Sequence, residues 1–273
     1  MDIIELRDTH LSVSRLSFGT ARLHHVRSTR DRQKLLATAY DHGFTHFDTS
    51  PYYGYGLNEA ALGKFISQRG ADATVATKIG LYSPLGSARN IAQIYFKKGL
   101  GKLLPRLSKP TIDLSLSRAE KSLDQSLRNL RRDVVDVLFL HEPDPRIVDA
   151  DETLTWLESQ RDKGRIRYWG VAGNHAQFST WLKEGHPLTQ VLQVRDQVDA
   201  EVDWGKEPSC YPQFTFGYLS AHGRHLSDET VTATLRQALW RNRFGSILVS
   251  TRKEERILVL ANAARTAKGQ NAV

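Results

Sequence analysis

Four side chains that can exchange protons stand at or just after the ends of apolar runs in the sequence. Asp48, Lys78 and His141 each close such a run, and Tyr53 lies in the glycine-bearing loop that follows Asp48. The carboxyl ends of successive parallel strands meet at one edge, so these four groups are predicted to converge. A carboxylate, an ammonium, a phenol and an imidazole held together offer charges that pair and a proton that can be transferred.

Taken singly, each of the four has a commoner explanation. An aspartate at a strand end often caps a helix, and a buried lysine usually just pairs with a carboxylate. Tyr53 is one of nine tyrosines, and His141 precedes Glu142-Pro143 and could simply close a turn. The hypothesis of a reactive site therefore rests on the combination and not on any one member.

Short apolar runs alternate with stretches of helical periodicity along the whole chain, which is typical of a parallel α/β fold. Eight apolar runs are predicted as strands: Leu16–Phe18, Thr45–Phe47, Thr74–Ala76, Val134–Leu140, Ile166–Val171, Val191–Val194, Phe214–Phe216 and Ser246–Val249. The predicted helices are Arg30–Asp41, Glu59–Ser67, Ser117–Leu130, Glu152–Lys163, Ala176–Lys183, Glu229–Arg241 and Lys253–Ala264. At this length a closed (β/α)8 TIM barrel is the first expectation, and an open doubly wound sheet is the second.

The remaining segments add detail to the predicted barrel. Residues 1–273 are predicted to form a single domain, with Asp2–Val13 as an N-terminal β-hairpin that covers the barrel floor. The segment from Lys78 to Ile112 is predicted as a loop excursion around a short basic helix, because it contains three prolines. Between Asp196 and Gln213 the sixth helix is expected to be short, irregular or missing, since this stretch has little periodicity.

The composition is that of an ordinary globular protein, with 40% hydrophobic and 25% charged residues, which excludes collagen-like and disordered chains. No apolar run reaches the roughly 20 residues of a membrane span. The first ten residues carry charge and lack the apolar core of a secretory signal. The single cysteine, Cys210, cannot form an internal disulfide, which fits a reducing compartment. We therefore expect a cytoplasmic protein with no membrane partner.

The charge balance is basic, with 38 Lys and Arg against 30 Asp and Glu, a net charge of +8. A nucleic-acid-binding barrel is therefore one alternative. However, the basic residues are scattered and do not interleave with aromatic residues, as a surface for single strands requires. We expect a solvated basic surface and no nucleic-acid partner. His222 and His225 are too weak a signal for a metal site, so no metal is expected.

The chain resembles the aldo-keto reductase family, and in particular its short bacterial-type members. The resemblance begins at Arg15–Thr20 and extends to the last helix, with the family's motifs in the family's order. These motifs are Gly43–Gly54, Asn58-Glu59, Leu62-Gly63, Thr77-Lys78, Ser122–Leu130, Val135–Asp144 and Gly164–Val171. The resemblance implies an NADPH-linked carbonyl reductase on a (β/α)8 barrel.

The resemblance maps the family's four catalytic residues onto Asp48, Tyr53, Lys78 and His141. Hydride transfer leaves alkoxide character on the carbonyl oxygen, and Tyr53 would supply the proton. Lys78 would lower the pKa of Tyr53, and Asp48 would keep Lys78 protonated and aimed. His141 would donate a hydrogen bond to the carbonyl oxygen and hold it in place. A histidine at this position, rather than an acid, favours reduction of carbonyls over carbon–carbon double bonds.

On the cofactor side the resemblance is looser. It assigns NADP(H) contacts to Gly19, Thr20, Asn174, Gln193, Ser250, Thr251, Arg252 and Arg256. The chain has Ala172-Gly173 where the family usually has Ser-Asn, so Asn174 comes one residue late, and Ser250 stands where many relatives have Lys or Gly. Arg252 and Arg256 could bind a 2′-phosphate, which favours NADP over NAD. The alternative for these two arginines is the solvated start of a helix.

These observations predict an NADPH-dependent oxidoreductase that reduces aldehyde, ketone or sugar carbonyls to alcohols, acting on a small molecule as a monomer or weak homo-oligomer. The chain ends directly after its last helix, so the pocket is expected to be open and the Lys78–Pro110 excursion to set selectivity. The alternative function is a non-catalytic relative that binds NADPH as a regulatory or redox-sensing subunit. The intact set of four residues weighs against that alternative.

Overall fold

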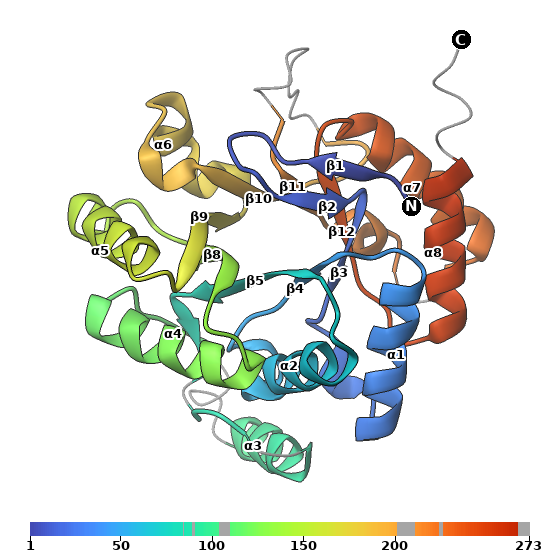
Figure 1. Ribbon diagram of the computed structural model, residues 1–273, viewed down its shortest axis with the longest axis horizontal. Helices are drawn as coiled ribbons and strands as arrows, with labels where there is room; N and C mark the ends of the chain where they lie inside the picture. The colour runs from blue at the N-terminus through green and yellow to red at the C-terminus, as the bar shows by residue number, and fades with distance from the viewer. Residues whose placement is uncertain (84, 89–90, 104–109, 201–210, 224–225, 267–273) are drawn as a thin grey trace.

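The computed structural model describes residues 1–83, 85–88, 91–103, 110–200, 211–223 and 226–266. Within them, parallel strands close into a barrel in the order β10-β11-β12-β3-β4-β5-β8-β9 (Figure 1). The strands are β3 (Leu16–Gly19), β4 (His46–Asp48), β5 (Thr74–Ile79), β8 (Val135–His141), β9 (Ile166–Gly173), β10 (Val191–Arg195), β11 (Phe214–Phe216) and β12 (Ser246–Val249). The strands follow one another around the circle in chain order, which is the TIM-barrel topology predicted from the sequence.

Helices surround this barrel on the outside (Figure 1). Those that follow barrel strands are α1 (Thr29–Asp41), α2 (Leu57–Arg69), α4 (Leu116–Leu130), α5 (Ala150–Asp162), α6 (Ser179–Lys183), α7 (Asp228–Arg241) and α8 (Glu254–Thr266). Side-chain caps fix several of their starts. The side chains of Ser28, Asp149 and Ser227 each accept a hydrogen bond from a backbone amide in the first turn of the following helix.

The apolar runs of the sequence predicted all eight barrel strands to within a few residues. The largest difference is in β5, which continues to Ile79 where the prediction ended at Ala76. Lys78 interrupts the apolar run, although its side chain is buried. A strand covered on both faces is apolar nearly throughout. A buried charged residue inside such a strand therefore makes the strand predicted from the apolar run end too early.

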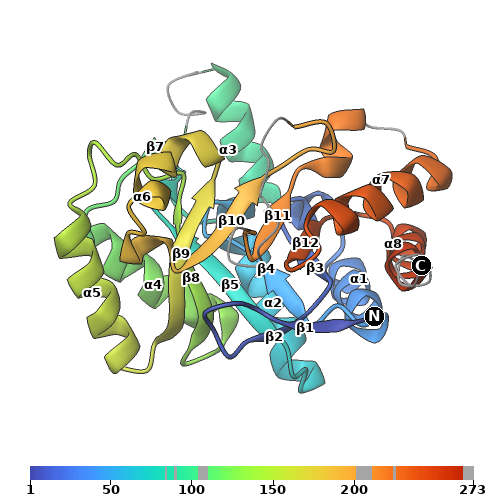
Figure 2. The same ribbon diagram turned by 90° about the horizontal axis from the view of Figure 1, so that it is seen from above.

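The segment from Lys78 to Ile112 corrects one expectation, since it is more than a loop around a helix. Strand β6 (Leu81–Tyr82) pairs antiparallel with β7 (Thr111–Ile112). Between them lies α3 (Ile91–Leu103), at the position of the predicted basic helix. The two strands were missed because two residues are too few to leave a periodic pattern. Figure 2 shows α3 beyond the carboxyl ends of the barrel strands, on the side opposite the N-terminal hairpin.

The expected irregularity after β10 is present in the part of the chain that the structure describes. Residues 196–200 and 211–213 form no helix. The intervening residues, including Cys210, lie outside the described residues, as does His225.

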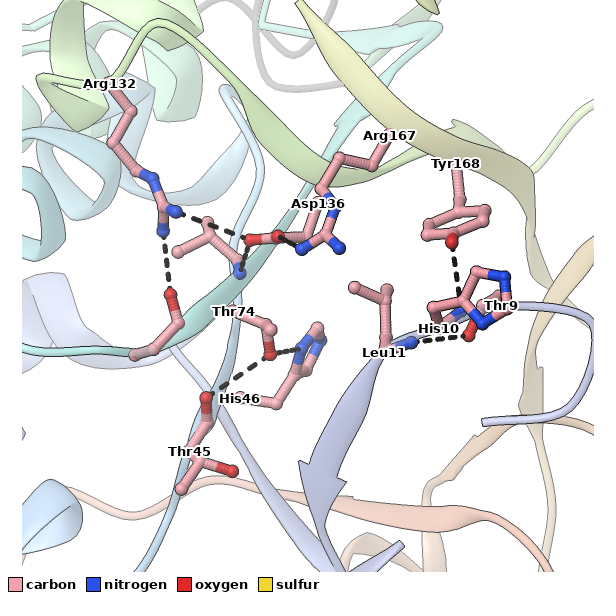
Figure 3. A network of polar contacts seen from close by, with 12 residues as sticks. Thr9, His10, Leu11, Thr45, His46, Thr74, Arg132, Asp136, Arg167 and Tyr168 are labelled. Carbon is pink, nitrogen blue, oxygen red and sulfur yellow. Dashed lines mark hydrogen bonds and ion pairs between the residues drawn. The ribbon is translucent and has the colours of Figure 1, made fainter. Parts of the chain in front are cut away.

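An N-terminal hairpin covers the floor of the barrel, as predicted. Strand β1 (Ile3–Glu5) pairs antiparallel with β2 (Ser12–Ser14). The hairpin places Leu6, Leu11 and Val13 against the lower interior of the barrel, where they are at most 1% exposed. The backbone amide of His10 donates to the Tyr168 hydroxyl at 2.9 Å (Figure 3). The floor is therefore closed by apolar packing.

Asp136 is the centre of a polar network at this floor (Figure 3). Its carboxylate accepts from the Val75 amide at 2.7 Å and from Arg167 at 3.0 Å, and a second guanidinium, from Arg132, lies at 3.7 Å. Asp136 is the polar residue in the middle of the most apolar predicted strand. Its buried charge is compensated by two arginines and one backbone amide.

His46 lies in the same layer and is fully buried. Its Nδ1 is 2.8 Å from the Thr74 hydroxyl, which itself donates to the Thr45 carbonyl, so Nδ1 carries the proton (Figure 3). The imidazole stacks on the Phe214 ring at a centroid distance of 4.6 Å. Burial, together with the charge of Lys78, lowers the pKa of His46 to about 3. His46 is thus a neutral packing residue.

Candidate active site

The carboxyl ends of the barrel strands open into a cavity of about 260 Å³. Asp48 ends β4, Lys78 lies near the end of β5, His141 ends β8, and Gln193 lies on β10. The cavity is lined by the polar side chains of Tyr52, Tyr53, Lys78, His141, Glu142 and Gln193, and by Leu81, Ala172, Gly173, Phe216 and Leu248. The structure thus brings three of the four predicted catalytic residues to the cavity wall, with Asp48 directly behind them.

A buried ion pair forms the base of this site. The Lys78 ammonium donates to the Asp48 carboxylate and to the Thr49 carbonyl oxygen at 3.0 Å. The Gln193 amide donates to the same Asp48 oxygen at 2.7 Å. The side chains of Lys78 and Asp48 are 1% and 2% exposed. Burial lowers the pKa of Lys78, while the carboxylates of Asp48 and Glu59 oppose that shift.

Tyr53 lies above the ion pair because of an unusual turn. The short 3₁₀ helix η2 (Tyr53–Gly56) has left-handed backbone at Gly54, with φ of +59°, and at Tyr55, with φ of +58°. A Cβ atom at Gly54 would lie 2.7 Å from the Cβ of His24, so a larger residue does not fit. This turn fixes the Tyr53 ring with its centroid 5.2 Å from the Lys78 ammonium.

The pKa of Tyr53 differs from the sequence-based expectation. Lys78 was expected to lower it, but burial raises the pKa well above its ordinary value, and the carboxylates of Asp48 and Glu142 add to the rise. The positive charge of Lys78, which is paired with Asp48, does not offset this rise of the Tyr53 pKa. Tyr53 is therefore a neutral phenol that holds its proton firmly.

His141 faces Tyr53 across the cavity. The ring centroids are 6.0 Å apart and the rings are perpendicular, with an angle of 89°. Burial and the charge of Lys78 lower the pKa of His141 to about 3, so its imidazole is neutral. Its Nδ1 is buried and has no hydrogen-bond partner among the described residues. A neutral imidazole at a cavity wall can form a hydrogen bond to a ligand through the ring nitrogen that faces the cavity.

Glu142 also lines the cavity, and the sequence reasoning placed it in a turn and in the motif Val135–Asp144 but not among the site residues. Its backbone is left-handed, with φ of +52°, which is rare for a residue with a side chain. The Glu142 amide donates to the Ala172 carbonyl at 2.7 Å, which holds the chain in this conformation. The sequence feature that could have identified Glu142 as a cavity residue is its position directly after the strand-end residue His141. The carboxylate gives this wall of the cavity a negative charge.

Glu59 is a second residue that the sequence reasoning did not place at the site. It lies in the first turn of α2, fully buried, and accepts from the Thr77 hydroxyl at 2.7 Å and from the Asn129 amide at 3.0 Å. Thr77 and Lys78 point to opposite faces of β5, so Glu59 binds the back of the strand that carries Lys78. The sequence feature that could have identified Glu59 is a charged residue on the apolar side of a predicted helix.

The predicted cofactor residues fall into two groups, of which the first lies near the cavity. Gln193 lines it, whereas Gly19 ends β3 and Thr20 follows it, where the Thr20 hydroxyl donates to the Thr49 hydroxyl at 2.9 Å. Asn174 is exposed and does not line the cavity, and its backbone amide donates to the Gln177 side chain at 2.8 Å. The strand end here offers Ala172 and Gly173 to the cavity in its place.

The second group follows β12. Ser250 and Arg252 are exposed, and the Thr251 hydroxyl accepts from the Lys253 amide at 3.1 Å just before α8. Arg256 is already engaged, since it donates to the Leu226 carbonyl at 2.7 Å and pairs with Asp228 at 3.0 Å. Among the described residues Arg252 forms no ion pair. Of the two arginines, Arg252 is therefore the one whose guanidinium is open to a phosphate.

This donor set fits a nicotinamide dinucleotide phosphate. The cavity wall includes the neutral imidazole of His141 and the glycine-containing end of β9, and the exposed Arg252 follows β12, whose Leu248 also lines the cavity. No group of three or more His, Cys, Asp or Glu residues in the described part of the chain could hold a metal ion. Within the same residues, no helix is long and apolar enough to cross a membrane.

Comparison with known proteins agrees with this architecture. The sequence pattern of the Aldo/keto reductase family matches residues 15–195. L-galactose dehydrogenase of Arabidopsis thaliana is 32% identical over 198 residues, which cover 68% of this chain and 54% of that protein. Pyridoxal 4-dehydrogenase of Microbacterium luteolum is 27% identical over 203 residues, which cover 69% of this chain and 57% of that protein. The chain therefore spans little more than half the length of these curated relatives.

Among solved structures, an aldo-keto reductase from Bacillus halodurans superposes with a TM-score of 0.73. The superposition covers 96% of this chain and 90% of that one, at 19% sequence identity. Likeness at this level of identity shows the shared barrel fold alone.

Proposed function

The chain belongs to the aldo/keto reductase family, and from that premise we propose that it is an NADP(H)-dependent reductase of aldehyde, ketone or sugar carbonyls. The observation that carries this proposal is the buried Lys78–Asp48 ion pair beneath a cavity whose walls include Tyr53 and His141. A sugar carbonyl is the favoured substrate class, because the cavity offers several polar side chains to hydroxyl groups and L-galactose dehydrogenase is a relative.

When bound, the nicotinamide would supply a hydride to the carbonyl carbon. Gln193 and the strand end Ala172-Gly173 would hold its carboxamide, and Arg252 would bind a 2′-phosphate through its guanidinium. Arg256 contributes less in this proposal because its donors already bind Leu226 and Asp228.

Tyr53 would act as the general acid. As the carbonyl accepts the hydride, its oxygen gains negative charge, and the Tyr53 hydroxyl gives its proton to that oxygen. The products are the alcohol and the oxidised cofactor, with the Tyr53 oxygen left as a phenolate. The raised pKa keeps the phenol protonated before reaction, and Lys78 at 5.2 Å from the ring stabilises the phenolate afterwards.

His141 would orient the carbonyl oxygen. Its imidazole is neutral, so it can donate one hydrogen bond to that oxygen without bringing a competing positive charge. Asp48 and Gln193 would fix the position of Lys78 and act through it. Asp48, Lys78 and Gln193 are already joined by hydrogen bonds in the structure, so this part of the site needs little rearrangement to react.

The test compares the wild type with Tyr53→Phe, and uses Tyr168→Phe at the barrel floor as a matched control. Cofactor binding is followed by NADPH fluorescence, and turnover by absorbance with a panel of aldehydes, ketones and aldoses. We expect binding in all three proteins and a loss of turnover of about 10²–10⁴-fold in Tyr53→Phe alone. Binding without turnover on any carbonyl would favour the regulatory alternative. The absence of binding to NADPH and NADH would overturn the proposal.

A further inference from the structure

A second buried carboxylate lies behind the active-site strand β5, and the proposed chemistry does not use it. Glu59 stands in the first turn of α2, directly after the turn that carries Tyr53, and is fully buried. Its Oε1 accepts a hydrogen bond from the Thr77 hydroxyl at 2.7 Å. Thr77 precedes Lys78 on β5, and the two side chains point to opposite faces of that strand. Lys78 therefore lies between two carboxylates, Asp48 inside the barrel and Glu59 outside it.

Helix α4 supplies the other hydrogen bond to Glu59. The Asn129 side-chain amide donates to Oε2 of Glu59 at 3.0 Å. The helices α2 and α4 are neighbours in the outer ring (Figure 1) and approach closely at Gly63, one turn beyond Glu59 on the same face of α2. A Cβ atom at Gly63 would lie 2.3 Å from the Asn129 carbonyl oxygen, so no larger residue fits there. The glycine thus lets the Asn129 side chain reach Glu59.

The directions of the hydrogen bonds from α4 make Glu59 an acceptor. Arg128 can only donate, and its guanidinium donates to the side-chain oxygen of Gln125 at 3.1 Å. The Gln125 amide group therefore faces Asn129 and donates to its Oδ1 at 2.9 Å, which leaves the Asn129 amide group for Glu59. With Thr77 donating to Oε1, both oxygens of Glu59 accept, as in the ionised form. Burial raises the pKa of the Glu59 carboxyl, while the hydrogen bonds that it accepts oppose that rise.

These contacts connect the acid of the proposed reaction to its neighbouring cation. Tyr53 lies six residues before Glu59, and Lys78 directly follows Thr77. The hydrogen bond between Glu59 and Thr77 therefore closes a short path from the Tyr53 turn to the strand that carries Lys78. At the other end of this path the Lys78 ammonium lies 5.2 Å from the centroid of the Tyr53 ring. The distance between acid and cation thus depends on the Glu59 hydrogen bond.

The Glu59 charge also acts on Lys78 through the strand. Burial lowers the pKa of Lys78, and the carboxylates of Asp48 and Glu59 oppose that shift. In an interior of low dielectric such an interaction extends beyond contact distance. Without the Glu59 charge, Lys78 would release its proton at lower pH. The other titratable side chains near Lys78 in the described part of the chain are neutral, namely Tyr53, His46 and His141.

We infer that Glu59 is a positioning residue of the site, which holds Lys78 beside Tyr53 through Thr77 and keeps Lys78 protonated. The inference rests on the proposed function, since it gives Glu59 a part in proton transfer from Tyr53. Glu59 does not line the cavity, so it acts on the reaction only through Lys78. A displacement of roughly 1 Å in a reacting group lowers a rate about 10²-fold, so a loosened strand would be costly.

The test separates the charge of Glu59 from its hydrogen bond. Glu59→Gln removes the charge and keeps the size, whereas Thr77→Val removes the hydrogen bond and keeps the charge. At saturating substrate and cofactor we expect turnover to fall about 10²-fold in Glu59→Gln and about tenfold in Thr77→Val, with unchanged NADPH affinity. Thr77→Ser restores the hydroxyl and should restore turnover.

Asp136→Asn is the matched control. Asp136 is also a buried carboxylate that binds β5, but at the Val75 amide near the barrel floor. This variant should lower the free energy of unfolding in urea and leave turnover as in the wild type. A merely structural role of Glu59 would give the same pattern.

Two further readouts respond to positioning and not to stability. The alkaline limb of the rate profile should move to lower pH in Glu59→Gln but not in Thr77→Val, because only the first variant makes Lys78 easier to deprotonate. The same change should appear without substrate, in an NMR titration of the Lys78 Cε signal in protein with isotope-labelled lysine. Lys78→Arg identifies that signal by its loss. We expect the signal to titrate at lower pH in Glu59→Gln than in the wild type or Asp136→Asn.

Three results would overturn the inference. One is a Glu59→Gln variant with the turnover and the alkaline limb of the wild type. Another is a Thr77→Val variant that turns over as fast as Thr77→Ser, and this result decides if Glu59→Gln does not fold. The last is a Lys78 signal that titrates alike in Glu59→Gln and the wild type. The NMR titration does not depend on catalysis, so a wild type that reduces no carbonyl would refute the proposed function while the effect of Glu59 on Lys78 is still tested.

Discussion

At the floor of the barrel, the Asp136 carboxylate binds the Val75 amide and Arg167, whose side chain is 46% exposed. At the mouth, the Asp48 carboxylate binds Lys78, whose side chain is 1% exposed and borders the cavity. The floor carboxylate thus shares its charge with a cation in contact with water. The carboxylate at the mouth is paired with a cation that borders the cavity and is shielded from bulk water. A ligand in the cavity would therefore interact electrostatically with the ion pair at short range and in a low dielectric.

The two buried histidines extend the comparison. Burial lowers the pKa of both His46 and His141 to about 3, and each has one ring nitrogen without a partner among the described residues. His46, however, binds Thr74 and is covered by Phe214, whereas His141 forms part of the cavity wall. A perturbed pKa therefore does not by itself distinguish a reactive histidine from a packed one, and the adjoining cavity does.

The largest effect is expected from Lys78→Met. Turnover should fall by about 10²–10⁴-fold, because the acid loses the cation that stabilises its phenolate. Stability should fall by about 3–5 kcal/mol, since Asp48 is left charged and buried without a cation. The double variant Asp48→Asn/Lys78→Met should regain most of the stability and none of the turnover. Urea denaturation and steady-state kinetics measure the two properties, and a double variant that is active would contradict the assigned roles.

His141→Asn should lower turnover about 10²-fold or more while the NADPH affinity stays close to that of the wild type, because a hydrogen-bond donor to the reacting oxygen is lost. His46→Phe should leave turnover unchanged. Kinetics with saturating cofactor compare the two histidines directly. Equal losses of turnover in both variants would contradict the assignment of His46 to packing and of His141 to the reaction.

The two histidines should behave alike in the pH dependence of stability. Each is neutral in the fold down to about pH 3 but takes up a proton near pH 6.5 when unfolded. The unfolded chain therefore binds more protons between these values, and stability falls as the pH decreases from 6.5 towards 3. Each histidine contributes up to about 1.4 kcal/mol per pH unit. His46→Phe should flatten this slope in urea titrations between pH 4 and 6.5, and an unchanged slope would refute the lowered pKa of His46.

Asp136→Asn at the floor should lower the free energy of unfolding by about 1–3 kcal/mol. The hydrogen bond to the Val75 amide becomes weaker, and two arginines lose the carboxylate with which they pair. Turnover should not change, since the site lies at the other end of the barrel. Arg167→Met should cost less than about 1 kcal/mol, because its side chain is half-exposed. A loss of turnover in Asp136→Asn with the fold intact would show that the two ends are coupled.

Glu142→Gln should have the smallest effect. The Glu142 charge raises the pKa of Tyr53, so its removal should lower that pKa and move the alkaline limb of the rate profile to lower pH. A carbonyl substrate that bears a carboxylate should gain about fivefold in kcat/KM, as repulsion of roughly 1 kcal/mol disappears. Neutral aldoses provide the internal comparison, and Glu142→Asp provides the charge-conserving control. An unshifted pH profile would mean that Glu142 does not act on Tyr53.

The sequence predicts the barrel well because each strand leaves its own local signal. The apolar runs mark all eight strands, and a polar residue at the end of a run marks Asp48 and His141. Convergence of these residues follows from the topology alone. The pairing of β6 with β7 gave no signal, because it joins residues that are about thirty apart, as the observed register shows.

The site details that the sequence could not predict depend on contacts between distant segments. Glu142 enters the cavity because its backbone is left-handed and bound to Ala172. The Arg256 guanidinium donates a hydrogen bond to the carbonyl of Leu226, in the loop before α7, and is therefore less available to a phosphate. The pKa of Tyr53 follows from burial, which outweighs the paired charge of Lys78. None of these contacts is visible in a linear pattern.

The closed floor of the barrel has a consequence for the order in which ligands bind and leave. Among the described residues, Leu6, Leu11 and Val13 fill the floor of the barrel, and the residues that line the cavity lie at or just after the carboxyl ends of the strands. If the proposed reduction takes place in this cavity, cofactor and carbonyl would enter from the same end of the barrel. A molecule bound against Lys78 would then leave only after the molecule bound above it. The expected result is ordered binding and release, which product-inhibition patterns would show.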